Sequence, residues 1–215
     1  MLEHAQVQVA DAARRLAADG LVAGTSGNLS AREGDRIAVS PTGAVLAELQ
    51  PEQVTITDLD GNVVGGGGLA PTSELDLHLE VYRRYDAGAV VHTHAPVATA
   101  LSTVLHELPV VHYEMLTLGG AIRVAPYRTF GTPELARDVA DALEGRTAVL
   151  MANHGTVSYG GDMASAIRAT EVLEWAATVY WRAAQVGTPR TLTDADMQDV
   201  VDTVVARNYG QVRSA

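Results

Sequence analysis

The sequence predicts an α/β fold, and three observations lead to this prediction. Amphipathic helical segments alternate along the chain with short runs rich in β-branched residues. The chain has 215 residues, which is enough for one large hydrophobic core. No internal repeat, change in composition or low-complexity segment divides it. We therefore expect a single domain over residues 1–215.

The N-terminal half alternates between helical and extended patterns. Apolar residues recur at helical spacing in the first segment until Asp19-Gly20 ends the pattern. Asp60-Gly61 separates two runs of β-branched residues, which is typical of a β-hairpin. Ser73 and Asp76 have the spacing of a capping box at a helix start. The elements expected here are a helix at 5–19, a turn-rich loop at 24–30 leading into a strand, a strand at 36–40, a hairpin of strands at 54–59 and 62–64, a glycine connector at 65–68 and a helix after Ser73.

The C-terminal half repeats this alternation. Two continuous apolar runs, 87–91 and 147–151, predict buried strands. Thr132 and Pro133 are typical of a helix start, and Gly187 ends the longest helical pattern, which carries Trp175 and Trp181. The further elements expected here are a helix at 96–105, strands at 109–111 and 121–125, a helix at 132–145, a long helix at 162–186 and a last helix from 194.

Composition and charge exclude several classes of function. The net charge is −11 and the 15 Lys and Arg residues are scattered, which argues against a nucleic-acid or anionic-membrane surface. The chain has no cysteine, so a metal would have to be held by histidines and carboxylates. The first residues lack the pattern of a signal peptide, and no apolar run is long enough to span a membrane. We expect a soluble protein of the cytoplasm.

Three histidines follow predicted buried strands. Side chains alternate along a strand, so His92 and His94 point to the same side, and His154 ends another strand. Zn²⁺ binds neutral imidazole, and three histidine ligands leave a coordination position open for catalysis. Bonds to backbone carbonyls are the alternative for each ring. The three positions together favour a metal site.

Three short segments could bind an anion without much positive charge. Residues 25–28, 40–43 and 72–73 each combine hydroxyl side chains with glycine or a helix start, and exposed N–H groups at such positions bind phosphate. Ordinary turns are the alternative for each segment. Glu74 follows directly and is a candidate metal ligand or acid/base, although an ordinary first-turn glutamate has the same pattern. Beside the histidines, the three segments favour a phosphorylated substrate.

A set of motifs in a fixed order then gives a specific resemblance. The chain resembles the class II aldolase and adducin family, and within it the enzymes that cleave fuculose phosphate, on motifs that cover nearly its whole length. The motifs are GTSGNLS at 24–30, SPTG at 40–43, Ser73-Glu74, AVVHTH at 89–94, His112-Tyr113, APYRTFGT at 125–132, Asn153-His154-Gly155 and Tyr209-Gly210.

The resemblance implies a fold, an assembly and roles for these residues. It implies a three-layer α/β/α domain with a mostly antiparallel sheet, assembled as a homotetramer with active sites between subunits. It implies one Zn²⁺ per subunit on His92, His94 and His154, with Glu74 as exchangeable ligand and acid/base. Tyr113 would be the proton donor at the aldehyde, from a neighbouring subunit. The residues implied to contact the substrate or its phosphate are Gly27, Asn28, Thr42, Gly43, Thr72, Ser73, Phe130 and Tyr209.

The implied reaction cleaves the C3–C4 bond of a ketose 1-phosphate, giving dihydroxyacetone phosphate and a short aldehyde such as lactaldehyde. Zinc would stabilise the resulting enediolate, and Glu74 would move a proton at C3 if its pKa is raised by burial or if the metal releases it. A dehydratase for methylthioribulose 1-phosphate, or an aldolase for another deoxypentulose 1-phosphate, is the alternative. A ribulose-phosphate epimerase is disfavoured because those enzymes usually carry aspartate at the position of Glu74. An adducin-like binding domain would not need the three histidines.

Overall fold

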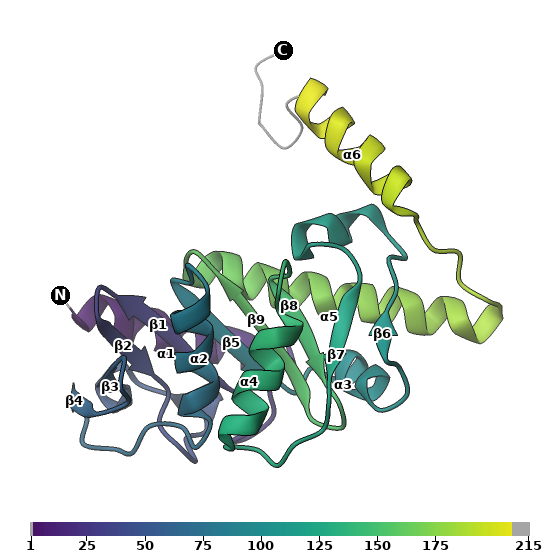
Figure 1. Ribbon diagram of the computed structural model, residues 1–215. Coiled ribbons are helices and arrows are strands. Elements are labelled where there is room, and N and C mark those ends of the chain that lie inside the picture. Colours follow the sequence, from purple (N-terminus) through teal and green to yellow (C-terminus); the bar gives the residue numbers. More distant parts are fainter. Residues whose placement is uncertain (1, 208–215) are drawn as a thin grey trace.

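One nine-stranded sheet lies between two layers of helices in the computed structural model, which describes residues 2–207 (Figure 1). The strand order is β4-β3-β2-β1-β5-β9-β8-β7-β6. Strands β7 and β8 are parallel and the other described neighbours are antiparallel, so the sheet is mixed. The α/β fold class is confirmed. The strands are β1 (Asn28–Glu33), β2 (Arg36–Val39), β3 (Thr55–Asp58), β4 (Val63–Gly66), β5 (Ala89–Thr93), β6 (Glu107–Leu108), β7 (Ile122–Ala125), β8 (Ala148–Met151) and β9 (Gly155–Gly160).

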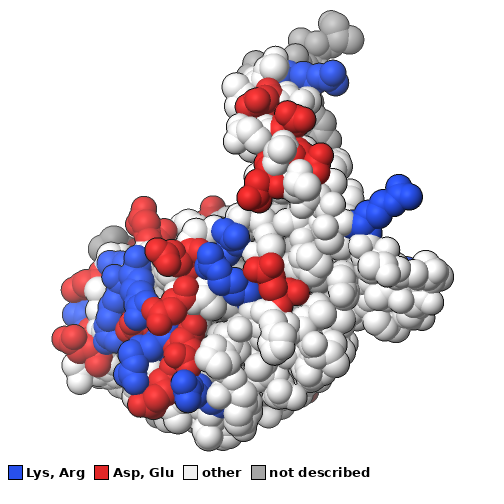
Figure 2. All heavy atoms as spheres, turned by 45° about the vertical axis from the view of Figure 1, so that its right-hand side comes forward, with Lys and Arg blue, Asp and Glu red and all other residues white. Residues whose placement is uncertain are grey.

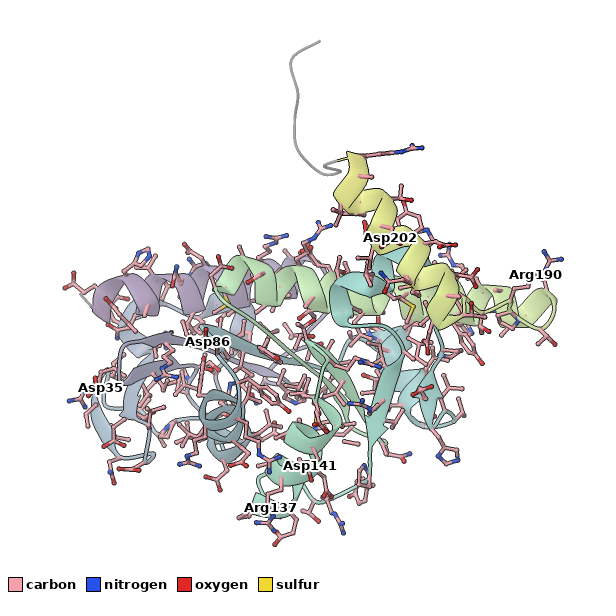
Figure 3. The ribbon with its side chains drawn as sticks, turned by 45° about the horizontal axis from the view of Figure 1, so that its top comes forward. Asp35, Asp86, Arg137, Asp141, Arg190 and Asp202 are labelled. Carbon is pink, nitrogen blue, oxygen red and sulfur yellow. The ribbon has the colours of Figure 1, made fainter. Side chains whose placement is uncertain are left out.

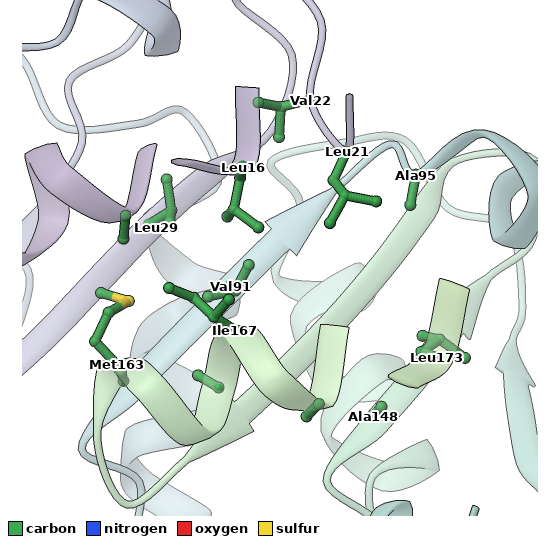
Figure 4. Packing of buried hydrophobic residues seen from close by; sticks show 14 of the residues in the cluster. Leu16, Leu21, Val22, Leu29, Val91, Ala95, Ala148, Met163, Ile167 and Leu173 are labelled. Atoms are coloured by element: carbon green, nitrogen blue, oxygen red, sulfur yellow. The ribbon is translucent and has the colours of Figure 1, made fainter. Parts of the chain in front are cut away.

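Each face of the sheet packs against its own set of helices. Helices α1 (Leu2–Ala18), α3 (Pro96–Ser102) and α5 (Met163–Val186) contribute to one hydrophobic cluster. Figure 4 shows part of this cluster, where Leu16 of α1 and Ile167 of α5 approach Val91 of the sheet. Helices α2 (Leu75–Arg84) and α4 (Pro133–Ala142) form a second cluster on the opposite face.

The alternation of side chains on the central strands positions the site. Leu29 of β1 and Val91 of β5 belong to the cluster with α1 and α5, whereas Val90 belongs to the cluster with α2 and α4. Because neighbouring residues of a strand point to opposite faces, Asn28 and His92 face α2. These two residues are direct partners in the β1–β5 ladder. A polar pair therefore lies inside the molecule where α2 begins.

The last helix extends away from the sheet. Helix α6 (Asp194–Arg207) projects from the body, as Figure 1 shows, and Met197 is its one buried residue. Acidic side chains line α6 in Figure 2, and acidic and basic groups are interspersed elsewhere on that face. Figure 3 places Asp202 on α6, while Arg137 and Asp141 lie on the outer side of α4. No helix within residues 2–207 is both long enough and apolar enough to cross a membrane.

Several local predictions differ from the structure. The predicted capping box of Ser73 and Asp76 is wrong: Glu74 is the N-cap of α2 and no side chain caps it. The strand expected at 109–111 is found at Glu107–Leu108, and β9 was not predicted, because its alternating small and polar residues lack a continuous apolar run. Trp175 and Trp181 are 42% and 47% exposed in the single chain, so they are not part of its core.

Candidate metal and phosphate site

The three predicted histidines converge at one end of the central strands. His92 lies in β5, His94 follows it, and His154 lies in the turn between β8 and β9. Their ring centroids are 4.9, 4.9 and 5.3 Å apart, and one ring nitrogen of each lies within 4.8 Å of those of the other two. Strands β5 and β9 are neighbours in the sheet, which is why residues so distant in sequence meet.

The turn between β8 and β9 depends on two unusual backbone positions. Asn153 adopts a positive φ of 55°, which asparagine tolerates better than most residues. A Cβ atom at Gly155 would lie 2.4 Å from the Thr93 carbonyl oxygen and 2.9 Å from Cδ2 of His94. Only glycine therefore lets β9 start this close to the histidine pair.

The hydrogen bonding of His92 leaves its Nε2 facing a second imidazole and a carboxylate. Its Nδ1 lies 2.9 Å from the carbonyl oxygen of Thr156 and donates to it. Its Nε2 lies 3.2 Å from Nε2 of His94 and 3.2 Å from Oε2 of Glu74. Two ligands of a tetrahedral Zn²⁺ are about 3.3 Å apart, given Zn–N bonds of roughly 2.0 to 2.1 Å. Nitrogen and oxygen atoms at this spacing fit a shared cation.

The environment keeps the other two rings in the form that binds metals. Burial, together with the nearby His92, lowers the pKa of His94 to about 4. Burial and His92 also lower the pKa of His154. Both imidazoles are therefore neutral near pH 7, and a neutral imidazole offers a lone pair to a metal ion.

Glu74 completes this group from the start of α2. Its side chain is buried, Oε2 accepts a hydrogen bond from Nδ2 of Asn28 at 2.9 Å, and Oε1 lies 3.5 Å from Nε2 of His154. Oε1 has no hydrogen-bond partner. Burial raises the pKa of Glu74, but the contacts with His92 and Asn28 outweigh it and lower the pKa to about 2. The carboxylate is thus ionised, so the first of the two conditions stated for its acid/base role, a pKa raised by burial, is not met.

The predicted phosphate segments line one cavity beside these groups. The cavity has a volume of about 310 Å³ and lies between the loops before β1, after β2 and before α2. The backbone joins the last two loops, because N–H of Thr42 donates to Ala70 and N–H of Thr72 donates to Ser40. The predicted residues that line the cavity are Gly27, Asn28, Thr42, Gly43, Thr72, Ser73, Glu74, His94, Phe130 and His154.

Several lining residues had no role assigned from the sequence. Arg128 is the one arginine or lysine among the described residues that line the cavity, and its guanidinium donates to Asp138 at 2.7 Å. Tyr127 lies beside it and Asn153 also contributes, whereas Thr25 and Ser26 belong to the predicted phosphate segment 25–28. These residues belong to the motifs that carry the family resemblance. Their composition alone did not separate them from ordinary loop residues.

Among the described residues, Tyr113 and His92 are predicted site residues that do not line the cavity. Tyr113 begins the 3₁₀ helix Tyr113–Leu118, is 43% exposed and lines a separate hollow with residues of α6. The prediction that it serves a neighbouring subunit is not tested by one chain. Tyr209 lies outside the described residues. His92 itself is fully buried behind the cavity, between β1 and β9.

One buried residue near the site was missed. His78 is fully buried on α2, and its Nε2 lies 2.5 Å from Oδ1 of Asn28. Its spacing of four residues from Glu74 places both on one face of a helix, which is a signal that could have linked them.

Comparisons with known proteins agree with this geometry. Residues 7–181 match the model of the "Class II Aldolase and Adducin N-terminal domain". The chain is 36% identical over 214 residues to the 5-deoxy-D-ribulose 1-phosphate aldolase of Bacillus thuringiensis, covering 98% of this chain and 99% of that protein. It is 40% identical over 202 residues to the 5-methylthioribulose-1-phosphate/5-deoxyribulose-1-phosphate aldolase of Rhodospirillum rubrum, covering 93% and 90%.

A solved structure of L-fuculose 1-phosphate aldolase superposes with a TM-score of 0.89 at 34% identity, covering 94% of this chain and 96% of that chain. The agreement extends over the sheet and both helical layers, because the aligned share leaves only a small part of the described chain unmatched. The family model, the full-length relatives and the fold lead to the same assignment. The chain belongs to the class II aldolase and adducin family.

Proposed function

We propose that this protein is a metal-dependent aldolase that cleaves a deoxyketose 1-phosphate to dihydroxyacetone phosphate and a short aldehyde. One observation carries the proposal: the buried carboxylate of Glu74 lies between the histidine group and the loops expected to bind phosphate, in contact with the same cavity. A carboxylate there can reach the carbon between the carbonyl and the bond that breaks. Neither a binding domain nor an isolated metal site requires this arrangement.

A divalent metal, which we propose is Zn²⁺, would be held by His92, His94 and His154, with Glu74 as an exchangeable fourth ligand. The proposal is supported by the nitrogen and oxygen atoms 3.2 Å apart and by the unpartnered Oε1 of Glu74. When bound, the metal supplies a Lewis acid that stabilises negative charge on the substrate as the C3–C4 bond breaks. The protein residues supply positioning and proton transfer.

The phosphate loops hold the substrate by the end that does not react. Hydroxyl groups of Thr42, Thr72 and Ser73 can donate to phosphate oxygens, and Gly27 and Gly43 leave room for a close approach of the backbone. This binding energy would orient C3 and C4 of the ketose relative to the carboxylate. The net charge of −11 is no obstacle, because donors that are local to the cavity bind the anion.

Two proton transfers complete the cleavage. A base removes the proton from the C4 hydroxyl, the electrons of the C3–C4 bond move to C3, and the aldehyde leaves with its new C=O bond. Glu74, which is ionised in the resting site, takes up a proton from solvent after the substrate binds and delivers it to C3, which yields dihydroxyacetone phosphate. We assign the first proton to Tyr113 of a neighbouring subunit, which also requires the homotetramer that the family resemblance implies. A cytoplasmic location stays a prediction from the sequence.

The relatives are named for substrates of different length. Two relatives with coverage of 90% or more are named for 5-deoxyribulose or 5-methylthioribulose phosphates, whereas relatives from Escherichia coli with 94% coverage and the structural relative are named for fuculose phosphate. Cleavage of a 5-deoxypentulose 1-phosphate gives acetaldehyde, and cleavage of fuculose 1-phosphate gives lactaldehyde. Both routes release dihydroxyacetone phosphate. A dehydratase would release none, because it keeps the carbon skeleton intact.

The test is an assay of dihydroxyacetone phosphate, coupled to NADH oxidation by glycerol-3-phosphate dehydrogenase. Purified protein is incubated separately with 5-deoxyribulose 1-phosphate, 5-methylthioribulose 1-phosphate and L-fuculose 1-phosphate, and the aldehydes are trapped and identified. We expect release that a chelator abolishes and added Zn²⁺ restores. Loss of water from a ketose phosphate without cleavage would establish the dehydratase instead. No reaction with any of the three by metal-loaded protein would refute the proposed function.

A further inference from the structure

A row of buried hydrogen bonds joins α2 to β1 behind Glu74. On α2, Glu74, His78 and Tyr82 are spaced four residues apart, so they lie on one face of the helix. On β1, Asn28 and Ser30 are two residues apart, so they lie on one face of the strand. All five side chains are buried. A helix face and a strand face thus bring five buried side chains with polar groups together.

The contacts form one continuous chain. Tyr82 Oη lies 2.7 Å from Ser30 Oγ, which lies 2.7 Å from Nδ1 of His78. Nε2 of His78 lies 2.5 Å from Oδ1 of Asn28. Nδ2 of Asn28 donates to Oε2 of Glu74 at 2.9 Å. None of these five residues has a buried polar atom without a partner except Oε1 of Glu74.

The Glu74 carboxylate at the end of the row determines which group donates and which accepts in each hydrogen bond. An ionised carboxylate only accepts, so the Asn28 amide must present its NH₂ group to Glu74 and its carbonyl oxygen to His78. His78 must then carry its proton on Nε2, which leaves Nδ1 as an acceptor for the Ser30 hydroxyl. Tyr82 in turn donates to Ser30. The chain is polarised from Tyr82 towards Glu74.

The surroundings keep this arrangement in one state. His78 is fully buried, and burial lowers its pKa to about 3, so it stays neutral. Burial also raises the pKa of Tyr82, so its hydroxyl keeps its proton. A neutral imidazole has one donor and one acceptor, and both are used here. A reversed Asn28 amide would place its carbonyl oxygen against Oε2 of Glu74, two acceptors together. It would also place its NH₂ group against the Nε2–H of His78, two donors together, so the reversed orientation is unfavourable.

We propose that His78 is a positioning residue, which acts through Asn28 to aim an NH₂ group at both Glu74 and the bound phosphate. Asn28 lines the cavity, and one of its two amide hydrogens is used by Glu74, which leaves the other for the substrate. The same contact holds Oε2 and leaves Oε1 buried beside His154 without a hydrogen bond. The part concerning phosphate rests on the proposed function.

Two substitutions separate positioning from simple packing. His78→Gln keeps one donor and one acceptor on a planar group, so it can still bond both Asn28 and Ser30. His78→Leu fills the space without either. Leu79→Val is the matched control, because Leu79 is buried on the same helix and its apolar side chain takes part in none of the hydrogen bonds of the row. Melting temperature, kcat, KM and binding of inorganic phosphate by calorimetry are measured for each.

We expect His78→Leu to lower kcat/KM by about 10- to 100-fold and to weaken phosphate binding, since an unpaired buried amide is free to reverse. His78→Gln should keep kcat/KM within about fivefold of the wild type, given that both bonds can re-form. Leu79→Val should lower the melting temperature with kcat/KM unchanged. Activity and phosphate affinity that fall in parallel with melting temperature across all three variants would overturn the proposal, as would a fully active His78→Leu.

The tautomer of His78 gives a readout that needs no activity and no variant that might fail to fold. Nitrogen-15 NMR of histidine-labelled protein at pH 7 distinguishes Nε2–H from Nδ1–H, and His78→Gln assigns the signal. We expect the Nε2–H form, and an Nδ1–H form or an imidazolium would overturn the proposal. A wild-type protein that binds phosphate and shows the expected tautomer but cleaves no ketose phosphate would refute the proposed function and leave the positioning role intact.

Discussion

Asn28 and His92 are direct partners across strands β1 and β5, and both meet the same oxygen of Glu74, at 2.9 and 3.2 Å. One strand pair thus fixes two contacts on a residue that comes from a different element, the start of α2. The second oxygen of Glu74 is left without a hydrogen bond. The two oxygens of this carboxylate therefore have different surroundings.

Replacing a histidine of the triad should remove the metal. We expect His154→Ala to lose most of its bound Zn²⁺ and at least about 100-fold in activity, because two imidazoles and a carboxylate hold a divalent ion less tightly. Metal content is measured by mass spectrometry of the purified protein. His106→Ala is the control, since His106 is exposed and lies outside the group. Equal metal content in the two variants would contradict the assignment.

Removing the charge of Glu74 should separate metal binding from proton transfer. Glu74→Gln keeps the size of the side chain and leaves the three histidines in place. We expect Zn²⁺ to remain bound while kcat falls by roughly 10²- to 10⁴-fold, the usual contribution of a general acid or base. Exchange of the C3 protons of dihydroxyacetone phosphate in D₂O, followed by proton NMR, reports this step directly. Exchange at the wild-type rate would assign the proton transfer to another group.

A methyl group at Gly155 should displace the rings of His92 and His94. Its Cβ would lie 2.9 Å from Cδ2 of His94 and 3.3 Å from Cε1 of His92. We expect Gly155→Ala to weaken Zn²⁺ binding by about 10-fold or more, as displaced ligand shells commonly do. Gly161→Ala is the matched control, because that position has nothing within 4 Å. Zn²⁺ affinity is measured by competition with a chelating dye, and a normal affinity in Gly155→Ala would show that the turn adjusts without moving the rings.

Mixed assemblies test whether Tyr113 serves a neighbouring chain. Glu74→Gln and Tyr113→Phe chains are each expected to be nearly inactive alone. If each site combines Glu74 of one chain with Tyr113 of another, co-expression should restore activity in the mixed sites that receive both native residues. If both residues act within one chain, every site in the mixture lacks one of them and activity stays low. Differently tagged chains, purified by both tags, make the comparison quantitative.

The sequence was sufficient for the elements that carry a strong local pattern. The helical spacing before Asp19-Gly20 and the Thr132-Pro133 start gave helices that the structure contains as α1 and α4. The Asp60-Gly61 hairpin is found as β3 and β4. The order of motifs indicated the family, which the comparisons confirm. Strand β9 was not predicted, because it begins with Gly155-Thr156 and has no apolar run.

Sequence alone could link some residues of the candidate site but not others. Residues that share a motif, such as His92 and His94, could be paired from sequence, because strand periodicity places them on one side. His78 could not be linked to Asn28, because 50 residues separate them and no local pattern states which helix face meets which strand. Tyr113 was expected to reach the site of a neighbouring subunit, and its place beside α6 in one chain leaves that a prediction.

The sequence by itself determined the fold class, the family and the set of chemical groups available, since these follow from local periodicity and motif order. Tertiary structure alone decided which oxygen of Glu74 is bonded and which is free, and in which direction the buried amide of Asn28 points. The physical reason is that hydrogen-bond direction is set by every partner at once. Those partners come from strands and helices that meet only in the folded chain.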